Sequence, residues 1–141
     1  LPATLEEFFT ADQFGQWWRD FRQKKPYFVQ YIAQPDMVGK LVGYIIDIPN
    51  AEETTEQKQA SQFASLSYGI MVNDGVISSM FDNHKLLAVV IQQFNGQKVD
   101  ERANKHFCDF IEVLLRGNPE SMAAFLEKNP EMNQKIVGSI G

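Results

Sequence analysis

Apolar residues recur along this chain at steps of three and four, the spacing that places them on one side of an α-helix. The clearest case runs from about Val99 to Arg116. Its apolar stripe consists of Ala103, Phe107, Phe110, Ile111, Leu114 and Leu115. Strict alternation of apolar and polar positions with Val, Ile and Thr, which marks half-buried strands, is nearly absent. The pattern therefore predicts an all-α fold.

Capping residues and prolines divide the rest of the chain into short helices. Thr4-Leu5-Glu6-Glu7 has the sequence of a capping box and predicts a helix start. Pro26 and Pro35 each predict a first helical turn, and Pro49 predicts a helix end. Asn118 and Asn129 both precede Pro and Glu, a pattern that predicts two more helices with Asn caps. The remaining helices are expected over about 11–24, through 63–71, and over about 76–81 and 86–94, the last closed by Asn95-Gly96.

Residues 50–58 contain three glutamates and no large apolar side chain, which predicts an acidic connecting loop within a single domain over residues 1–141. Short helices joined by tight turns favour a fragment of an α-solenoid of the HEAT or armadillo kind, although no repeat period is visible in the sequence. Folds of that kind commonly work by offering extended surfaces to other proteins.

Charge excludes two classes of partner. The 141 residues include 13 Lys and Arg against 18 Asp and Glu, a net charge of -5. Binding to nucleic acid or to an acidic membrane surface depends on concentrated positive charge, so we expect neither. No apolar run approaches the roughly 18 to 20 residues that a bilayer crossing needs. The single cysteine, Cys108, cannot form an internal disulfide, and we expect a cytoplasmic or nuclear protein.

The titratable residues favour no catalytic or metal site. His106 and Cys108 are two residues apart on a predicted helix, so their side chains point to roughly opposite sides and cannot form a dyad. Asp109 and Glu112 lie on the polar side of that helix, with no second pair of metal ligands elsewhere. His84 is expected to be solvated or to cap a helix. Because the common catalytic motifs are also missing, we expect no enzyme and no cofactor.

Residues 16–25 interleave aromatic side chains with four basic ones. Trp17 and Phe21 share one helical face, and Trp18 and Arg22 share another. The simplest expectation is that one tryptophan joins the core and the other stays half exposed. Trp and Arg are also over-represented among the residues that dominate protein interfaces, so Trp18 and Arg22 are candidate partner contacts.

Four parts of the chain carry a family resemblance. Thr4–Glu7 looks like a Thr-Leu-x-Glu opening, Leu41–Pro49 like Leu-Val-x-Phe-Ile-Ile-Glu-Glu-Pro, and Phe63–Met71 like Tyr-Pro-x-Ile-Ser-Cys-Glu-Leu-Leu. In the tail, residues 107–115 look like a helix, 118–120 like Lys-Pro-Glu, 125–126 like Phe-Leu, and 136–141 like Ile-Ile-x-His-Ile-Gly. These patterns resemble the SAPS domain, found in regulatory subunits that associate with the phosphatase-six type of serine/threonine phosphatase catalytic subunit. The chain departs from them at Ile48, Ala64, Gly69 and Ser139, where the family has an acidic residue, Pro, Glu and His.

The resemblance implies the amino-terminal part of a longer helical-repeat domain. Its expected function is noncatalytic: it would bind the phosphatase catalytic subunit and direct its substrate choice or location. Asp47 and Pro49, just before the acidic loop, become candidate partner contacts beside Trp18 and Arg22.

A second interpretation is a small bacterial or phage α-helical assembly or interaction protein. The two interpretations differ at the carboxyl end. A self-contained small protein buries Met132, Ile136 and Val137 internally, whereas a repeat-array fragment leaves an apolar face uncovered beyond them.

Overall fold

A computed structural model of the chain describes residues 1–23, 25–49, 51–96, 101–132 and 134. Within these ranges the regular elements are helices and there is no strand, which confirms the all-α prediction. The named helices are α1 (Leu5–Thr10), α2 (Phe14–Arg22), α3 (Pro26–Ile32), α4 (Pro35–Ile46), α5 (Thr55–Met71), α6 (Asp74–Asp82), α7 (His84–Gly96), α8 (Glu101–Gly117) and α9 (Pro119–Lys128). None of the helices in the described part of the chain is both long and apolar enough to cross a bilayer.

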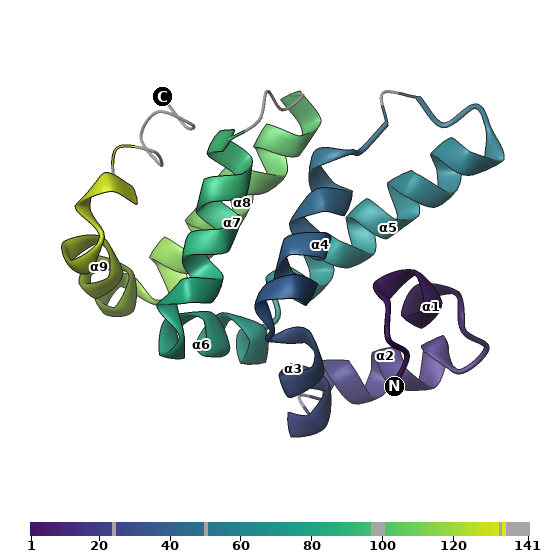
Figure 1. Cartoon of the computed structure of the whole chain (residues 1–141), viewed down its shortest axis with the longest axis horizontal. Coiled ribbons are helices and arrows are strands. Elements are labelled where there is room, and N and C mark those ends of the chain that lie inside the picture. Colours follow the sequence, from purple (N-terminus) through teal and green to yellow (C-terminus); the bar gives the residue numbers. More distant parts are fainter. Residues whose placement is uncertain (24, 50, 97–100, 133, 135–141) are drawn as a thin grey trace.

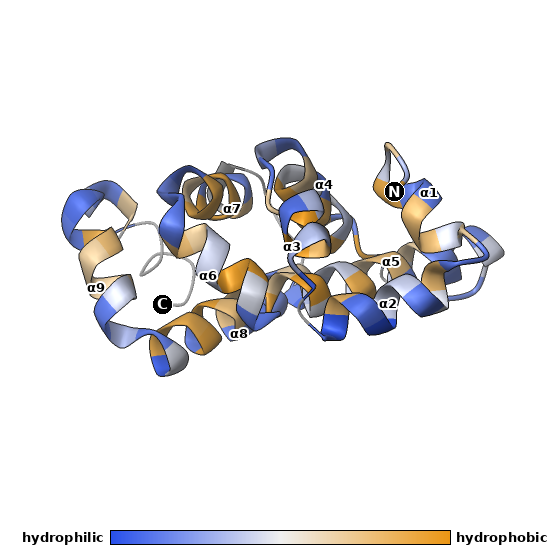
Figure 2. Cartoon of the chain, turned by 90° about the horizontal axis from the view of Figure 1, so that it is seen from below, coloured by the Kyte–Doolittle hydropathy of each residue, from blue (hydrophilic) through white to orange (hydrophobic). Residues whose placement is uncertain are grey.

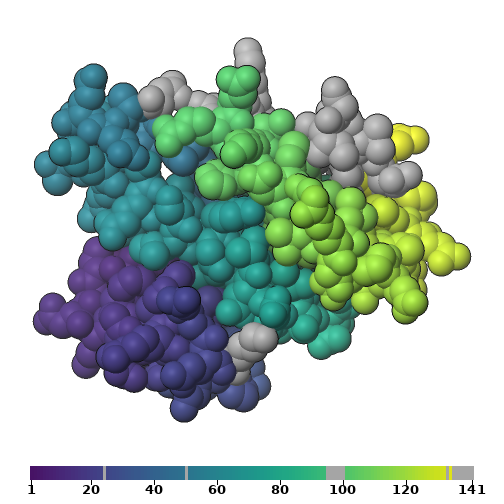
Figure 3. Space-filling model, turned by 180° about the vertical axis from the view of Figure 1, so that it is seen from behind, coloured from purple at the N-terminus to yellow at the C-terminus, as the bar shows by residue number. Residues whose placement is uncertain are grey.

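The longer helices lie in two layers. In Figure 1 and Figure 2, α4 and α7 lie side by side in one layer, and α5 and α8 form the other. α4 packs on α5 within the hairpin that the 47–54 loop closes, and Phe94 of α7 contacts Phe107 of α8 with ring centroids 4.6 Å apart. Figure 3 shows the helices α1 to α3 and the helix α9 at opposite sides of the molecule.

Apolar side chains from both layers meet between them and form one large core. Each layer contributes residues that are almost completely buried, which is the arrangement expected when amphipathic helices cover one another's apolar sides. The core residues of these four helices include Val38, Leu41, Val42, Ile45, Ile70, Leu87, Val90, Ile91, Phe107, Phe110 and Leu114.

Aromatic side chains hold α1, α2 and α3 together at the amino-terminal end. Phe8 of α1 stacks on Trp17 of α2, with ring centroids 5.5 Å apart and planes 5° apart. Its ring also contacts Phe28 of α3 at 6.3 Å and Tyr31 at 5.7 Å. The hydroxyl of Tyr31 donates a 2.6 Å hydrogen bond to the carbonyl of Pro2, which ties the first residues to α3.

The capping signals predict some helix starts and miss others. Thr4 caps α1 as expected, because its hydroxyl accepts a hydrogen bond from the backbone N–H of Glu7 at 3.2 Å. The two-way capping box lies instead at Thr54 and Gln57, which begins α5 at Thr55. The acidic loop therefore ends at Thr54 and not at residue 58. Asn73, whose side chain accepts from two N–H groups, likewise begins α6 earlier than predicted.

The second helix is shorter than the sequence predicts. It spans Phe14–Arg22 and not 11–24. The backbone N–H of Phe14 donates to the carbonyl of Ala11 in a turn, so residues 11–13 lead into the helix without belonging to it. Lys24 lies outside the described residues.

Two predictions for the last helices are wrong. Leu115 does not belong to the buried stripe of α8: its side chain is 45% exposed, whereas Leu114 beside it is completely buried. Asn118 holds the N-cap position of α9 but forms no side-chain cap bond. The side chain of Asn129 donates back to the carbonyl of Phe125 at 3.0 Å and so closes α9.

Residues 130–132 are helical, as the second Asn-Pro-Glu pattern predicts, and Met132 is buried. Ile136 and Val137, which would separate the two interpretations of the carboxyl end, lie outside the described residues.

Candidate protein-binding surface

Trp18 is half-buried and packs against α5. Its ring lies between those of Phe14 and Phe21, with centroids 5.5 and 5.7 Å away. The outer edge of the indole faces Gly69, where an added Cβ atom would be 3.6 Å from it. Trp17 is also half-buried, so one half-exposed tryptophan is found as predicted, whereas the prediction that the other is fully part of the core is wrong. Both rings fill space between helices.

Arg22 ends α2 and its side chain is exposed. Asp47 follows α4 as its C-cap residue and is exposed too, while its backbone N–H donates to the carbonyl of Gly43 at 3.0 Å. Pro49 is half-buried, and its carbonyl accepts a hydrogen bond from the guanidinium group of Arg102 on α8. This bond fastens the start of the acidic loop to the other layer.

The structure does not gather the four predicted contact residues into one patch. Trp18 lies against Gly69, near the carboxyl end of α5, whereas Asp47 lies at the carboxyl end of α4. Because α4 and α5 run antiparallel, these two places are at opposite ends of the hairpin (Figure 1). Trp18 and Arg22 on one side, and Asp47 and Pro49 on the other, are therefore two separate surfaces.

A surface that the sequence did not predict runs along α4, and Asp47 belongs to it. We call it the α4 face, formed by Pro35, Asp36, Gly39, Lys40, Gly43, Tyr44 and Asp47, with α7 on one flank and Glu6 of α1 on the other. An α-helix turns 100° per residue, so Asp36 and Asp47, eleven residues apart, point almost the same way. They are about 16 Å apart along the helix axis. Gly39 and Gly43 carry no side chain, so the surface of α4 is recessed between the two aspartates.

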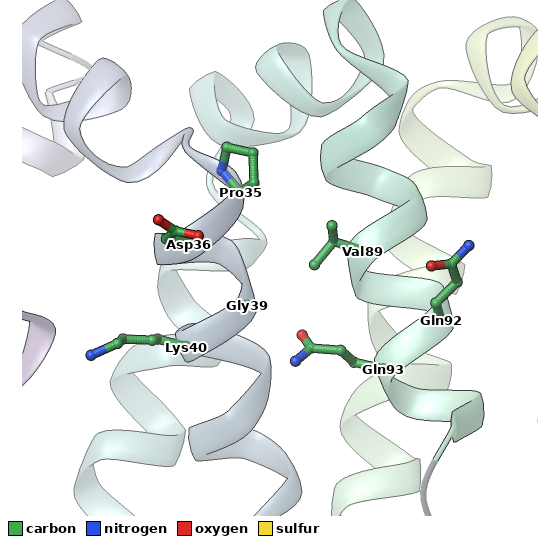
Figure 4. Close-up of a pocket in the computed structure, with 7 residues that line it drawn as sticks. All are labelled: Pro35, Asp36, Gly39, Lys40, Val89, Gln92 and Gln93. Carbon is green, nitrogen blue, oxygen red and sulfur yellow. The ribbon is translucent and has the colours of Figure 1, made fainter.

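One flank of the α4 face is a groove of about 760 Å³ between α4 and α7. Figure 4 shows Val89 and Gln93 pointing from α7 toward α4, with the Gln93 amide opposite Gly39. A Cβ atom at residue 39 would lie 3.7 Å from Oε1 of Gln93, so the missing side chain leaves room for the amide. That Oε1 atom is buried and accepts no hydrogen bond from any described residue.

The other flank is a hollow of about 200 Å³ beside α1. The hydroxyl of Tyr44 donates a hydrogen bond to the carboxylate of Glu6. Burial, followed by this bond and the charge of Glu6, raises the pKa of Tyr44 far above its usual range. The Tyr44 ring also contacts Phe9 and Phe63, with centroids 6.1 and 5.5 Å away, so it links α1, α4 and α5.

The α4 face and its flanks are net negative. Glu6, Asp36 and Asp47 are acidic and Lys40 is basic, which gives a sum of -2. Among the described residues, none of these four side chains forms an ion pair. Their charges are therefore available to a charged partner.

The remaining titratable residues pack as structural side chains. His84 is half-buried with its ring against Phe125 of α9 at 5.2 Å, so the prediction of a solvated or capping histidine is wrong. Cys108 is half-buried, and burial raises the pKa of its thiol, which disfavours the thiolate. Glu112 pairs with Arg116 at 2.5 Å on the exposed side of α8.

His106 is half-buried against Tyr68 of α5, with ring centroids 4.7 Å apart. Burial lowers the pKa of His106, although Asp109 acts in the opposite direction. Within the described ranges, no three His, Cys, Asp or Glu side chains are arranged to hold a metal ion.

Comparisons with known proteins give no family for this chain. It matches no family model, no curated protein and no solved structure.

Proposed function

We propose that this chain is a noncatalytic helical scaffold that binds a serine/threonine phosphatase catalytic subunit of the phosphatase-six type and directs its substrate choice or location. The observation that carries the scaffold part is the two-layer packing in which α4 and α7 lie side by side over α5 and α8. Helix pairs stacked in this way form α-solenoids of the HEAT and armadillo kind, which present extended surfaces to other proteins. The phosphatase part rests on the residues that resemble the SAPS domain.

Two features of the fold support a role in binding. Apolar residues of both layers fill the space between them, so the outward sides of α4 and α7 are rigidly placed. Charged side chains on those outward sides form no ion pair with other described residues, which leaves them available for specificity. A rigid surface with fixed charges can hold a catalytic subunit in one orientation.

The contact residues are proposed as two surfaces. One surface is formed by Trp18 and Arg22 on α2, and the other by Asp47 and Pro49, which follow α4. A catalytic subunit large enough to span the α4–α5 hairpin would contact both. Because Trp18 also packs on Gly69, the exposed charges are the better places to test the contact.

The test is direct binding of the purified phosphatase catalytic subunit to this chain, measured by surface plasmon resonance. We expect Arg22→Glu and Asp47→Lys each to weaken binding about tenfold, since reversing a contact charge both removes an attraction and adds a repulsion. Their matched controls, Arg116→Glu and Asp82→Lys, reverse exposed charges at the ends of α8 and α6 and are expected to bind like the parent chain.

The outcomes separate the two parts of the proposal. If the folded parent chain does not bind the catalytic subunit, the phosphatase assignment is wrong. If the parent binds and all four variants bind equally well, the assignment stands and both proposed contact surfaces are wrong. Circular dichroism melts of each variant show that the comparison is made between folded proteins.

A further inference from the structure

We draw no further inference here: the strongest candidate, the open groove between α4 and α7 beside Gly39, is lined by one aspartate and one lysine whose charges cancel, and nothing in the structure shows what covers it.

Discussion

The indole of Trp18 lies over Gly69 of α5, with room for one methyl group between them and for little more. An α-helical glycine costs stability relative to alanine, and the ring above Gly69 limits the space at this position to about one methyl group.

Gly69→Ala should stabilise the fold by about 0.5 to 1 kcal/mol, because its methyl group makes an ordinary contact with Trp18 and the helix gains an alanine. Gly69→Leu should instead cost about 1 to 3 kcal/mol, because the longer side chain displaces the indole. Urea unfolding measures both. At Gly15, where no atom lies within 4 Å of the added Cβ, alanine and leucine should both be tolerated. Equal behaviour at the two positions would contradict the packing described here.

A second prediction uses two adjacent leucines of α8. Leu114→Ala should cost about 3 kcal/mol, because it leaves a cavity in the shared core. Leu115→Ala should change the free energy of unfolding by no more than about 0.5 kcal/mol, since that side chain is half exposed. The measurement is again urea unfolding of each variant. A large loss at Leu115 would show that another element covers this side of α8.

The sequence alone predicts the helices well because caps and prolines act locally. Thr4, Pro26 and Pro35 lie at helix starts in the structure as predicted. The prediction that Leu115 is buried is wrong because spacing alone does not tell how much of the helix surface other helices cover. Leu115 lies four residues after Ile111 and so near the apolar side, but the covered part of α8 includes Leu114 and not Leu115.

The candidate surface was harder to predict. Asp47 was found from the sequence, but Asp36 and Gly39 were not, although their spacing with Asp47 places all three on one side of α4. The groove depends on where α7 lies, and no local pattern states that α4 and α7 are neighbours. The buried oxygen of Gln93 is visible only once the two helices are placed.

Ile48 and Ala64 form a contact that the sequence did not predict. They pack together with Ala103 in a small buried cluster apart from the main core. A dry contact between the loop, α5 and α8 requires apolar residues at these places. No local pattern in the sequence links the three positions.

Tyr44 predicts a dependence on alkaline pH. Its pKa is raised in the folded state, so the neutral phenol is favoured by folding. The contribution to stability is complete below the ordinary tyrosine pKa of about 10 and is lost as the pH rises above it, because the unfolded chain ionises first. Tyr44→Phe should therefore lose less stability than the parent between pH 9 and about 11. Thermal melts across this range test it, and an unchanged slope would contradict the Tyr44–Glu6 bond.

His106 predicts a dependence on acidic pH with the opposite sign. Burial lowers its pKa in the folded state, so the unfolded chain binds the proton first. The contribution of the neutral ring is complete above the ordinary histidine pKa of about 6.5 and is lost as the pH falls through the folded value. An NMR titration should show His106 titrating at lower pH in the folded chain than in the urea-unfolded chain. His106→Phe, which keeps a ring against Tyr68, should remove this part of the acid destabilisation.

Both tryptophans of the chain lie on α2, inside the aromatic cluster at one side of the molecule. Tryptophan fluorescence therefore reports on the unfolding of α1, α2 and the part of α5 beneath Trp18, and it does not report on α8 and α9. Stacked helical arrays can lose their terminal helices before the rest unfolds. A melt followed by fluorescence would miss fraying at the α9 end that a melt followed by far-ultraviolet circular dichroism would record. The difference between the melting curves followed by fluorescence and by circular dichroism measures how cooperatively the helices unfold.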